Sequence, residues 1–139
     1  MATRSTIAIE FADNSVSQVY CHWDGYLENN GAILAQHYMD PFKVRDLVDL
    51  GDFSSLRETV EDTKEGAYHF SRGEEFCVRR YMNADEYFAD CQQEEYDYIL
   101  RQVEGKPVWF VRFYATEGKW VTLAEAVAIE QKIREEECY

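Results

Sequence analysis

The chain has 139 residues, about the size of one domain, and its 14 Lys and Arg against 27 Asp and Glu give a formal net charge of −13. Apolar residues make up 46% and aromatic residues 15%, which is enough to offset chain entropy in a packed core and excludes a disordered chain. Seven Gly and two Pro exclude a collagen-like or low-complexity class. Direct nucleic-acid binding is also excluded, because phosphate contacts need clustered Lys and Arg.

No segment indicates export or membrane insertion. The first six residues lead straight into a strand-like pattern, without a basic stretch followed by an apolar one. Four cysteines are scattered along the chain, and we expect reduced thiols in a cytoplasmic protein that does not contact a membrane: Cys21, Cys77, Cys91 and Cys138. Apolar surroundings predict burial of Cys21 and Cys77, whereas Cys138 beside the terminus is expected to be exposed.

The N-terminal third alternates between apolar and polar residues and then changes to helical spacing. The predicted elements are a strand, a turn, a second strand and a helix, over 5–12, 13–15, 16–23 and 31–38. A further helix then begins, with Asp40 as its N-cap and Pro41 at its first position. Gly51 is the expected C-terminal stop.

The middle of the chain, 58–75, is polar and is expected to be the most mobile or variable segment, with a short strand at 68–70. A strand is predicted over 76–81. Asn83 and Glu86 then form a capping box, which opens a helix that runs to about residue 93.

The C-terminal third predicts a second hairpin, with strands over 96–103 and 108–114 joined by a turn at 104–107. Thr122 and Glu125 form another capping box, before a helix over 123–136. Its apolar face is expected to hold Leu123, Ala126, Val127, Ile129 (or Glu130) and Ile133. These elements predict an α+β fold in one domain, 1–139: a mostly antiparallel sheet built from two hairpins, with helices packed on it.

The densest group of chemically versatile side chains lies in 20–26, at the predicted end of the second strand. His22, Trp23, Asp24 and Tyr26 are suited to a ligand pocket, in which aromatic rings stack on a planar group and His22 or Asp24 hydrogen-bonds to it. The same residues also suit a strand end whose Trp and Tyr are part of the core, with Asp24 in the turn. The sequence leaves both interpretations open.

No motif predicts catalysis, a metal or a cofactor. The chain has no paired Cys or His at zinc-ligand spacing, no phosphate-binding glycine loop and no nucleophile motif. We therefore expect no metal, no cofactor and no enzyme activity, with hydrolysis of a nucleotide signal as the catalytic alternative.

The charged residues allow two kinds of binding site. Arg101 and Arg112 lie in predicted strands, where a guanidinium either pairs with a carboxylate or lines a pocket for a phosphate. The acidic clusters at 85–97 and 130–137 are expected either to keep the protein soluble or to imitate the phosphates of DNA.

Several segments resemble a family of small proteins encoded by tailed bacteriophages, prophages and some bacteria. The likeness is carried by 5–8, 19–27, His37-Tyr38, 98–100 and 106–109, and its core is the Cys-His-Trp-Asp-Gly-Tyr stretch. The family is largely uncharacterised, and no catalytic residue carries over from it. The resemblance implies a phage accessory protein that acts in the host bacterial cytoplasm on host physiology or defence.

The sequence thus predicts a counter-defence protein that acts by non-covalent binding. The first hypothesis is that a homo-oligomer sequesters a nucleotide-like host immune signal in a pocket lined by His22, Trp23, Asp24, Tyr26, Arg101 and Arg112. The alternative is an acidic protein–protein inhibitor, DNA-mimicking or not, of a host defence or nucleic-acid-handling enzyme.

Overall fold

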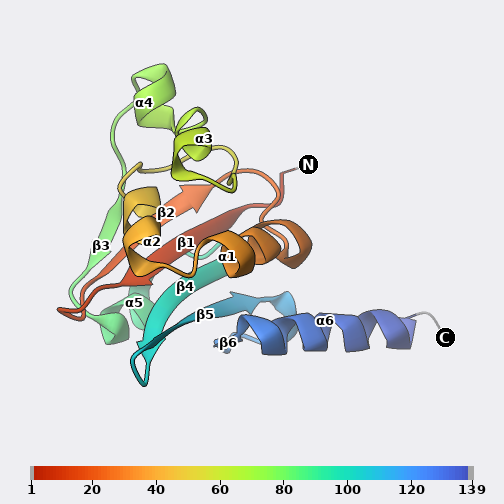
Figure 1. The fold of residues 1–139 in the computed structure, drawn as a ribbon. Helices are drawn as coiled ribbons and strands as arrows, with labels where there is room; N and C mark the ends of the chain where they lie inside the picture. Colours follow the sequence, from red (N-terminus) through yellow and green to blue (C-terminus); the bar gives the residue numbers. More distant parts are fainter. Residues whose placement is uncertain (1, 138–139) are drawn as a thin grey trace.

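A computed structural model describes residues 2–137. Six strands form one sheet in the order β3-β2-β1-β4-β5-β6 (Figure 1). Their bounds are β1 (Ser5–Glu10), β2 (Val16–Cys21), β3 (Arg79–Tyr81), β4 (Tyr96–Val103), β5 (Lys106–Phe113) and β6 (Val121–Thr122). β1 and β4 run parallel and all other neighbours run antiparallel. The predicted α+β class and mostly antiparallel sheet are therefore confirmed.

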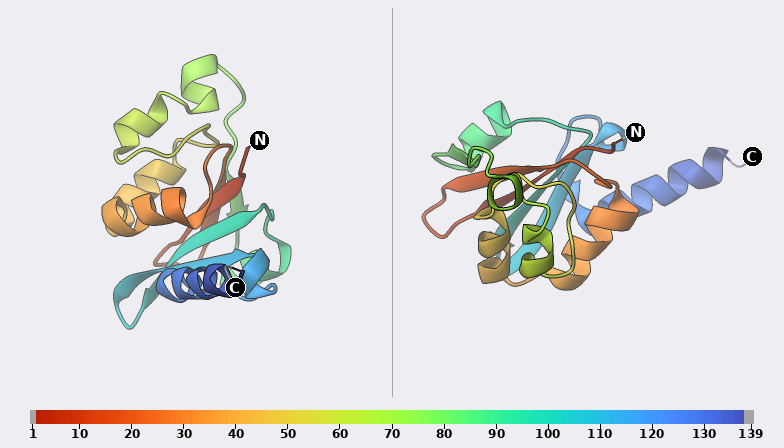
Figure 2. Two further views of the ribbon diagram at one scale, coloured as in Figure 1. Left: turned by 90° about the vertical axis from the view of Figure 1, so that its right-hand side faces the viewer. Right: turned by 90° about the horizontal axis from the view of Figure 1, so that it is seen from above.

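Helices cover both faces of this sheet. Their bounds are η1 (Leu27–Gly31), α1 (Ala32–His37), α2 (Pro41–Val48), α3 (Val60–Lys64), α4 (Tyr68–Arg72), α5 (Ala84–Asp90), η2 (Tyr114–Thr116) and α6 (Leu123–Glu137). The helices α1, α2 and the first half of α6 lie on one face, and α5 lies on the other (Figure 2). The second half of α6 extends beyond the sheet (Figures 1 and 2).

The strands supply a separate core to each face, because successive side chains point to opposite sides. In β1, Ile7 and Ile9 belong to the larger core under α1 and α2, whereas Ala8 belongs to the smaller core under α5. In β4, Tyr98 packs in the larger core and Ile99 in the smaller one. We refer to the side covered by α5 as the α5 face.

Local capping signals are confirmed at three helices. The Asp40 carboxylate accepts the Phe42 N–H at 3.0 Å, so α2 begins at Pro41 as predicted. The Asn83 side chain accepts the Glu86 N–H at 2.9 Å at the start of α5. Before α6, the Thr122 hydroxyl accepts the Glu125 N–H at 3.2 Å, and the Glu125 carboxylate accepts the Thr122 N–H at 3.3 Å.

The second hairpin is tighter than the sequence predicts. Glu104 and Gly105 both have left-handed backbone angles, with φ of 53° and 79°. Two such residues are typical of the two-residue turn that matches strand twist. Lys106 and Pro107 therefore belong to β5 and not to the turn.

The middle of the chain differs most from the prediction. The strand expected at 68–70 is wrong, because these residues begin α4. The polar stretch 58–75 holds two short helices, and the Thr59 hydroxyl caps the first by accepting the Asp62 N–H at 3.1 Å. The strand expected over 76–81 is limited to β3, which pairs with β2 over three residues only.

Other expectations need smaller corrections. The helix predicted to reach residue 93 ends at Asp90. On α6, Val127 is exposed, and of the two alternatives Ile129 and Glu130 it is Glu130 that is buried. Cys21 is buried but Cys77 is only half-buried, and Cys138 lies outside the described residues. Within 2–137, no helix has the length and apolar character needed to cross a bilayer.

Candidate functional site

The chain turns sharply where it leaves β2. Asp24 has a left-handed φ of 57°. A Cβ on Gly25 would lie 2.6 Å from the Ser5 Cβ and 2.9 Å from the Thr3 carbonyl oxygen, so only glycine fits there. The Trp23 N–H donates to the Ser54 carbonyl at 2.8 Å, which fixes this loop beside the segment after Phe53. Asp24 is thus held in a conformation that side-chain-bearing residues rarely adopt.

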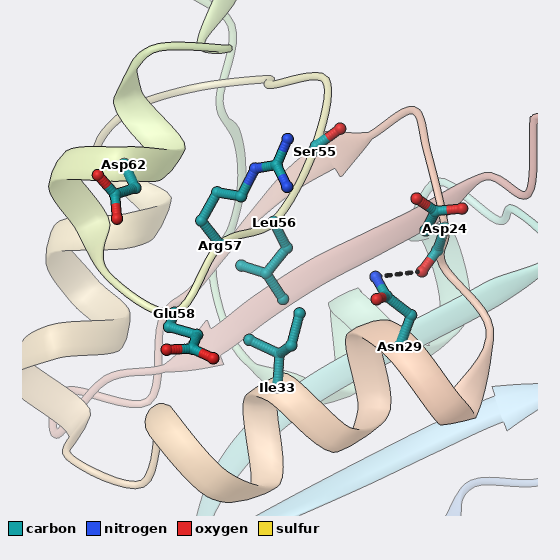
Figure 3. A pocket seen from close by; sticks show the side chains of 8 residues that line it. All are labelled: Asp24, Asn29, Ile33, Ser55, Leu56, Arg57, Glu58 and Asp62. Carbon is teal, nitrogen blue, oxygen red and sulfur yellow. Dashed lines mark hydrogen bonds between the residues drawn. The ribbon is translucent and has the colours of Figure 1, made fainter.

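A π-helical turn, η1, follows and was not predicted. The N–H groups of Gly31 and Ala32 bond five residues back, to the carbonyls of Tyr26 and Leu27. The Asn29 side chain donates to the Asp24 carbonyl at 3.1 Å. Figure 3 shows this bond, and it shows the Asp24 carboxylate pointing away from it. The backbone of Asp24 is therefore held while its charge remains available.

A cavity of about 360 Å³ lies between this loop, α1 and the segment before α3 (Figure 3). Ile33 and Leu56 face each other across it, and the other lining residues are polar. These are Asp24, Asn29, Ser55, Arg57, Glu58 and Asp62. The cavity thus combines an apolar centre with charged walls.

Arg57 is the one cation of this cavity lining. Its backbone is anchored at both ends, since its N–H donates to the Thr63 hydroxyl at 3.0 Å and its carbonyl accepts from the Tyr38 hydroxyl at 2.8 Å. Among residues 2–137, its guanidinium has no ion-pair or hydrogen-bond partner. It also borders a second cavity of about 210 Å³, which shares Ser55 and Asp62 with the first.

The lining of the larger cavity carries three carboxylates and one guanidinium, a formal charge of 1 − 3 = −2. Lys43 donates to the carbonyl of Glu58, and His37 Nε2 lies 3.7 Å from the Glu58 carboxylate. The Asp24 and Asp62 carboxylates form no ion pair within the described chain. Such a site attracts cations and hydrogen-bond donors more strongly than phosphates.

Of the aromatic segment predicted as a pocket, only Asp24 lines the cavity. His22 is half-buried and Trp23 is exposed; their ring centroids lie 4.7 Å apart in an edge-on arrangement, and the His22 Nδ1 is 2.7 Å from the Tyr20 hydroxyl. Trp23 is 44% exposed and Tyr26 37% exposed, so neither ring belongs to the core.

The two strand arginines lie elsewhere, on the α5 face. Arg101 pairs with Glu10 at 3.2 Å, and Arg112 pairs with Asp97 at 3.2 Å. Arg112 also stacks over the Trp120 ring, with 4.8 Å to its centroid. The structure therefore does not bring Arg101 and Arg112 together with the loop around Asp24.

Asp97 is the centre of a buried polar network. It accepts hydrogen bonds from the Thr6 hydroxyl at 2.7 Å and from the Glu94 N–H at 3.0 Å. Burial raises the pKa of Asp97 above its usual value, and its bonds to Thr6, Glu94 and Arg112 oppose that rise. This network joins β1, β4 and β5 to one another. Arg112 therefore has a structural role.

Two features of the described residues bear on chemical reactivity. Burial raises the pKa of the Cys21 thiol, so that it stays protonated and is a poor nucleophile at neutral pH. No group of three or more His, Cys, Asp or Glu in the described chain is arranged to hold a metal ion.

Sequence reasoning missed most residues of the cavity lining. These residues form no motif. Asn29 reaches Asp24 through the η1 turn, whereas Ser55, Arg57, Glu58 and Asp62 meet it because the 53–54 segment pairs with the end of β2. Comparison with family models, curated proteins and solved structures gives no match for this chain.

Proposed function

We propose that this protein acts by non-covalent binding to a basic surface of a partner protein, with the cavity beside Asp24 as an anchor point. The observation that supports this most is the charge of the cavity, −2 from its lining residues. The two arginines expected to bind phosphate are engaged with Glu10 and Asp97 instead. The resemblance to phage accessory proteins favours a host defence or nucleic-acid-handling enzyme as that partner.

The cavity suits a Lys or Arg side chain of such a partner. The aliphatic stem of a basic side chain would pack against Ile33 and Leu56, while its head would pair with a carboxylate at one side of the cavity, that of Asp24 or that of Asp62 (Figure 3). The net charge of −13 would attract a basic partner over longer distances and repel polyanions. Binding of this kind weakens as salt is added.

The test is affinity capture from bacterial lysate, followed by cross-linking and peptide mapping. The cavity variant Asp24→Asn, Glu58→Gln, Asp62→Asn is expected to lose the partner. A matched variant, Asp90→Asn, Glu104→Gln, Glu117→Gln, removes the same charge from exposed positions outside this lining and is expected to retain it. Equal capture by all three proteins would refute the cavity as an anchor.

A second candidate is sequestration of a nucleotide-like molecule. It is favoured by Arg57, whose guanidinium has no partner in the described chain, and by the exposed ring of Trp23, whose backbone N–H bonds to the Ser54 carbonyl three residues before Arg57. In that case Arg57 would bind a phosphate and Trp23 would stack on a base. Arg57→Ala and Trp23→Ala would then release a small molecule, whereas Arg101→Ala would not.

A further inference from the structure

Three charged side chains meet where α6 passes η1. Arg134 Nη2 lies 3.2 Å from the Glu130 carboxylate, one turn earlier on α6, and it also pairs with Glu28 of η1. Glu130 is only 7% exposed and is the last buried residue of α6. Beyond it the helix extends away from the sheet (Figures 1 and 2). The cluster therefore lies at the point where α6 leaves the body of the protein.

The cluster has one negative charge more than its single guanidinium can balance. Within residues 2–137, the titratable groups that act on it from other elements are tyrosines: Tyr96 and Tyr98 from β4, and Tyr114 from η2. A tyrosine side chain carries no positive charge in any protonation state, so none of the three supplies a cation. Two carboxylates on one arginine, one of them buried, repel each other, and a shared proton relieves that repulsion.

We propose that Glu28, Glu130 and Arg134 form a proton-controlled clasp, in which the two carboxylates share a proton while α6 is docked on η1 and loss of that proton loosens the helix. The clasp does not depend on which partner the Asp24 cavity binds.

The direction of the pH effect follows from the folded-state pKa. Burial and the neighbouring Glu28 raise the pKa of Glu130 from 4.5 to about 7. The docked state therefore binds more protons than the undocked state between these two values. Docking is strongest at the low end of this range and weakens as the pH rises through about 7, so the switch operates near neutrality.

Loosening α6 would open apolar surface. A groove of about 250 Å³ runs between η1, α1 and α6, and Leu27, Leu123 and Val127 line it. It continues into a wider hollow of about 570 Å³ beside Trp109, since both share Ala35, Leu123 and Val127. Glu28, Glu130 and Arg134 also line this groove, so release of the clasp would change its shape.

Hydrogen exchange of the full chain tests the clasp. Protection of the amides around Ala126–Glu130, corrected for the intrinsic pH dependence of exchange, is expected to fall by about tenfold or more between about pH 5.5 and pH 8. Protection of the β4 amides is the internal reference. Glu130→Gln keeps the shape of the side chain without its charge and should abolish the pH dependence, whereas Glu135→Gln on the exposed part of α6 should leave it intact.

A carboxyl NMR titration provides the second readout. Glu130 is expected to titrate near pH 7, and Glu28→Gln should move that midpoint down. The proposal is wrong if Glu130 titrates near its ordinary value, if Glu130→Gln retains the pH-dependent exchange, or if β4 loses protection in parallel with α6. The last result would indicate global unfolding and not release of the helix.

Discussion

The Arg112 guanidinium contacts the Asp97 carboxylate at 3.2 Å on the α5 face, and both side chains are largely buried there, 13% and 1% exposed. Removing one partner of a buried pair leaves an uncompensated charge, which is far costlier than losing a surface pair. This buried pair indicates that Arg112 is a structural residue and not a ligand-binding one.

Arg112→Ala is expected to lower the free energy of unfolding by about 3–5 kcal/mol. Arg101→Ala removes a more exposed pair with Glu10, together with a stack on Phe88, and should cost only about 1 kcal/mol. Urea denaturation of both variants measures this difference. Unfolding of both variants like the wild type would contradict a structural role for the network around Asp97.

The destabilisation by Arg112→Ala is expected to depend on pH. Without the guanidinium, the already raised pKa of Asp97 rises further. A carboxyl whose folded-state pKa is raised loses stability as the pH rises through that pKa, so the loss should be larger at about pH 8 than at about pH 5.5. The lower of these two pH values stays above the isoelectric point of about 4.5, at which the protein would lose its net charge. The same loss at both pH values would contradict this account of Asp97.

Two tyrosines of the smaller core provide a matched pair. The Tyr87 hydroxyl is fully buried without a hydrogen-bond partner in the described chain, whereas the Tyr81 hydroxyl donates to Gln18 at 2.8 Å and accepts from the Gln92 N–H at 3.2 Å. Tyr87→Phe is therefore expected to be neutral or to stabilise by about 1 kcal/mol, and Tyr81→Phe to destabilise by about 1–2 kcal/mol. Thermal and urea unfolding distinguish the two, and the reverse order would contradict the arrangement of this core.

Gly25 is expected to tolerate no side chain. Gly25→Ala would place a methyl group against Ser5 and the Thr3 carbonyl, at a cost of about 1–3 kcal/mol. Gly31 is the control: its nearest neighbour would be 3.4 Å away and its backbone is helical, so Gly31→Ala should be neutral or stabilising. Equal stability of the two variants, measured by urea unfolding, would mean that the loop before η1 is not tightly packed.

Local signals in the sequence predicted much of the fold. The caps at Asp40, Asn83 and Thr122 each act within a few residues, so one stretch of sequence contains the whole interaction. The same holds for the alternation in β1, in which Ile7 and Ala8 occupy separate cores. Element types were therefore predictable where the interactions that fix them are local.

Contacts between distant segments were not predictable. Thr6 meets Asp97, and Glu10 meets Arg101, across 91 residues in each case. A lone arginine in a strand does not reveal whether its carboxylate partner lies on a neighbouring strand. The cavity was unpredictable for the same reason, because Asp24 and Arg57 are brought to it only by the pairing of the 53–54 segment with β2. No local pattern in 27–31 predicts the π-helical turn.

Native mass spectrometry after incubation with bacterial lysate tests the binding proposal most directly. The wild-type protein is expected to retain a basic protein partner, to lose it as salt is added, and to lose it in the Asp24→Asn, Glu58→Gln, Asp62→Asn variant. Denaturing the same sample shows whether a small molecule was bound. Release of an intact phosphorylated molecule, with no protein partner and no effect of the three substitutions, would contradict the proposal and favour sequestration through Arg57 and Trp23.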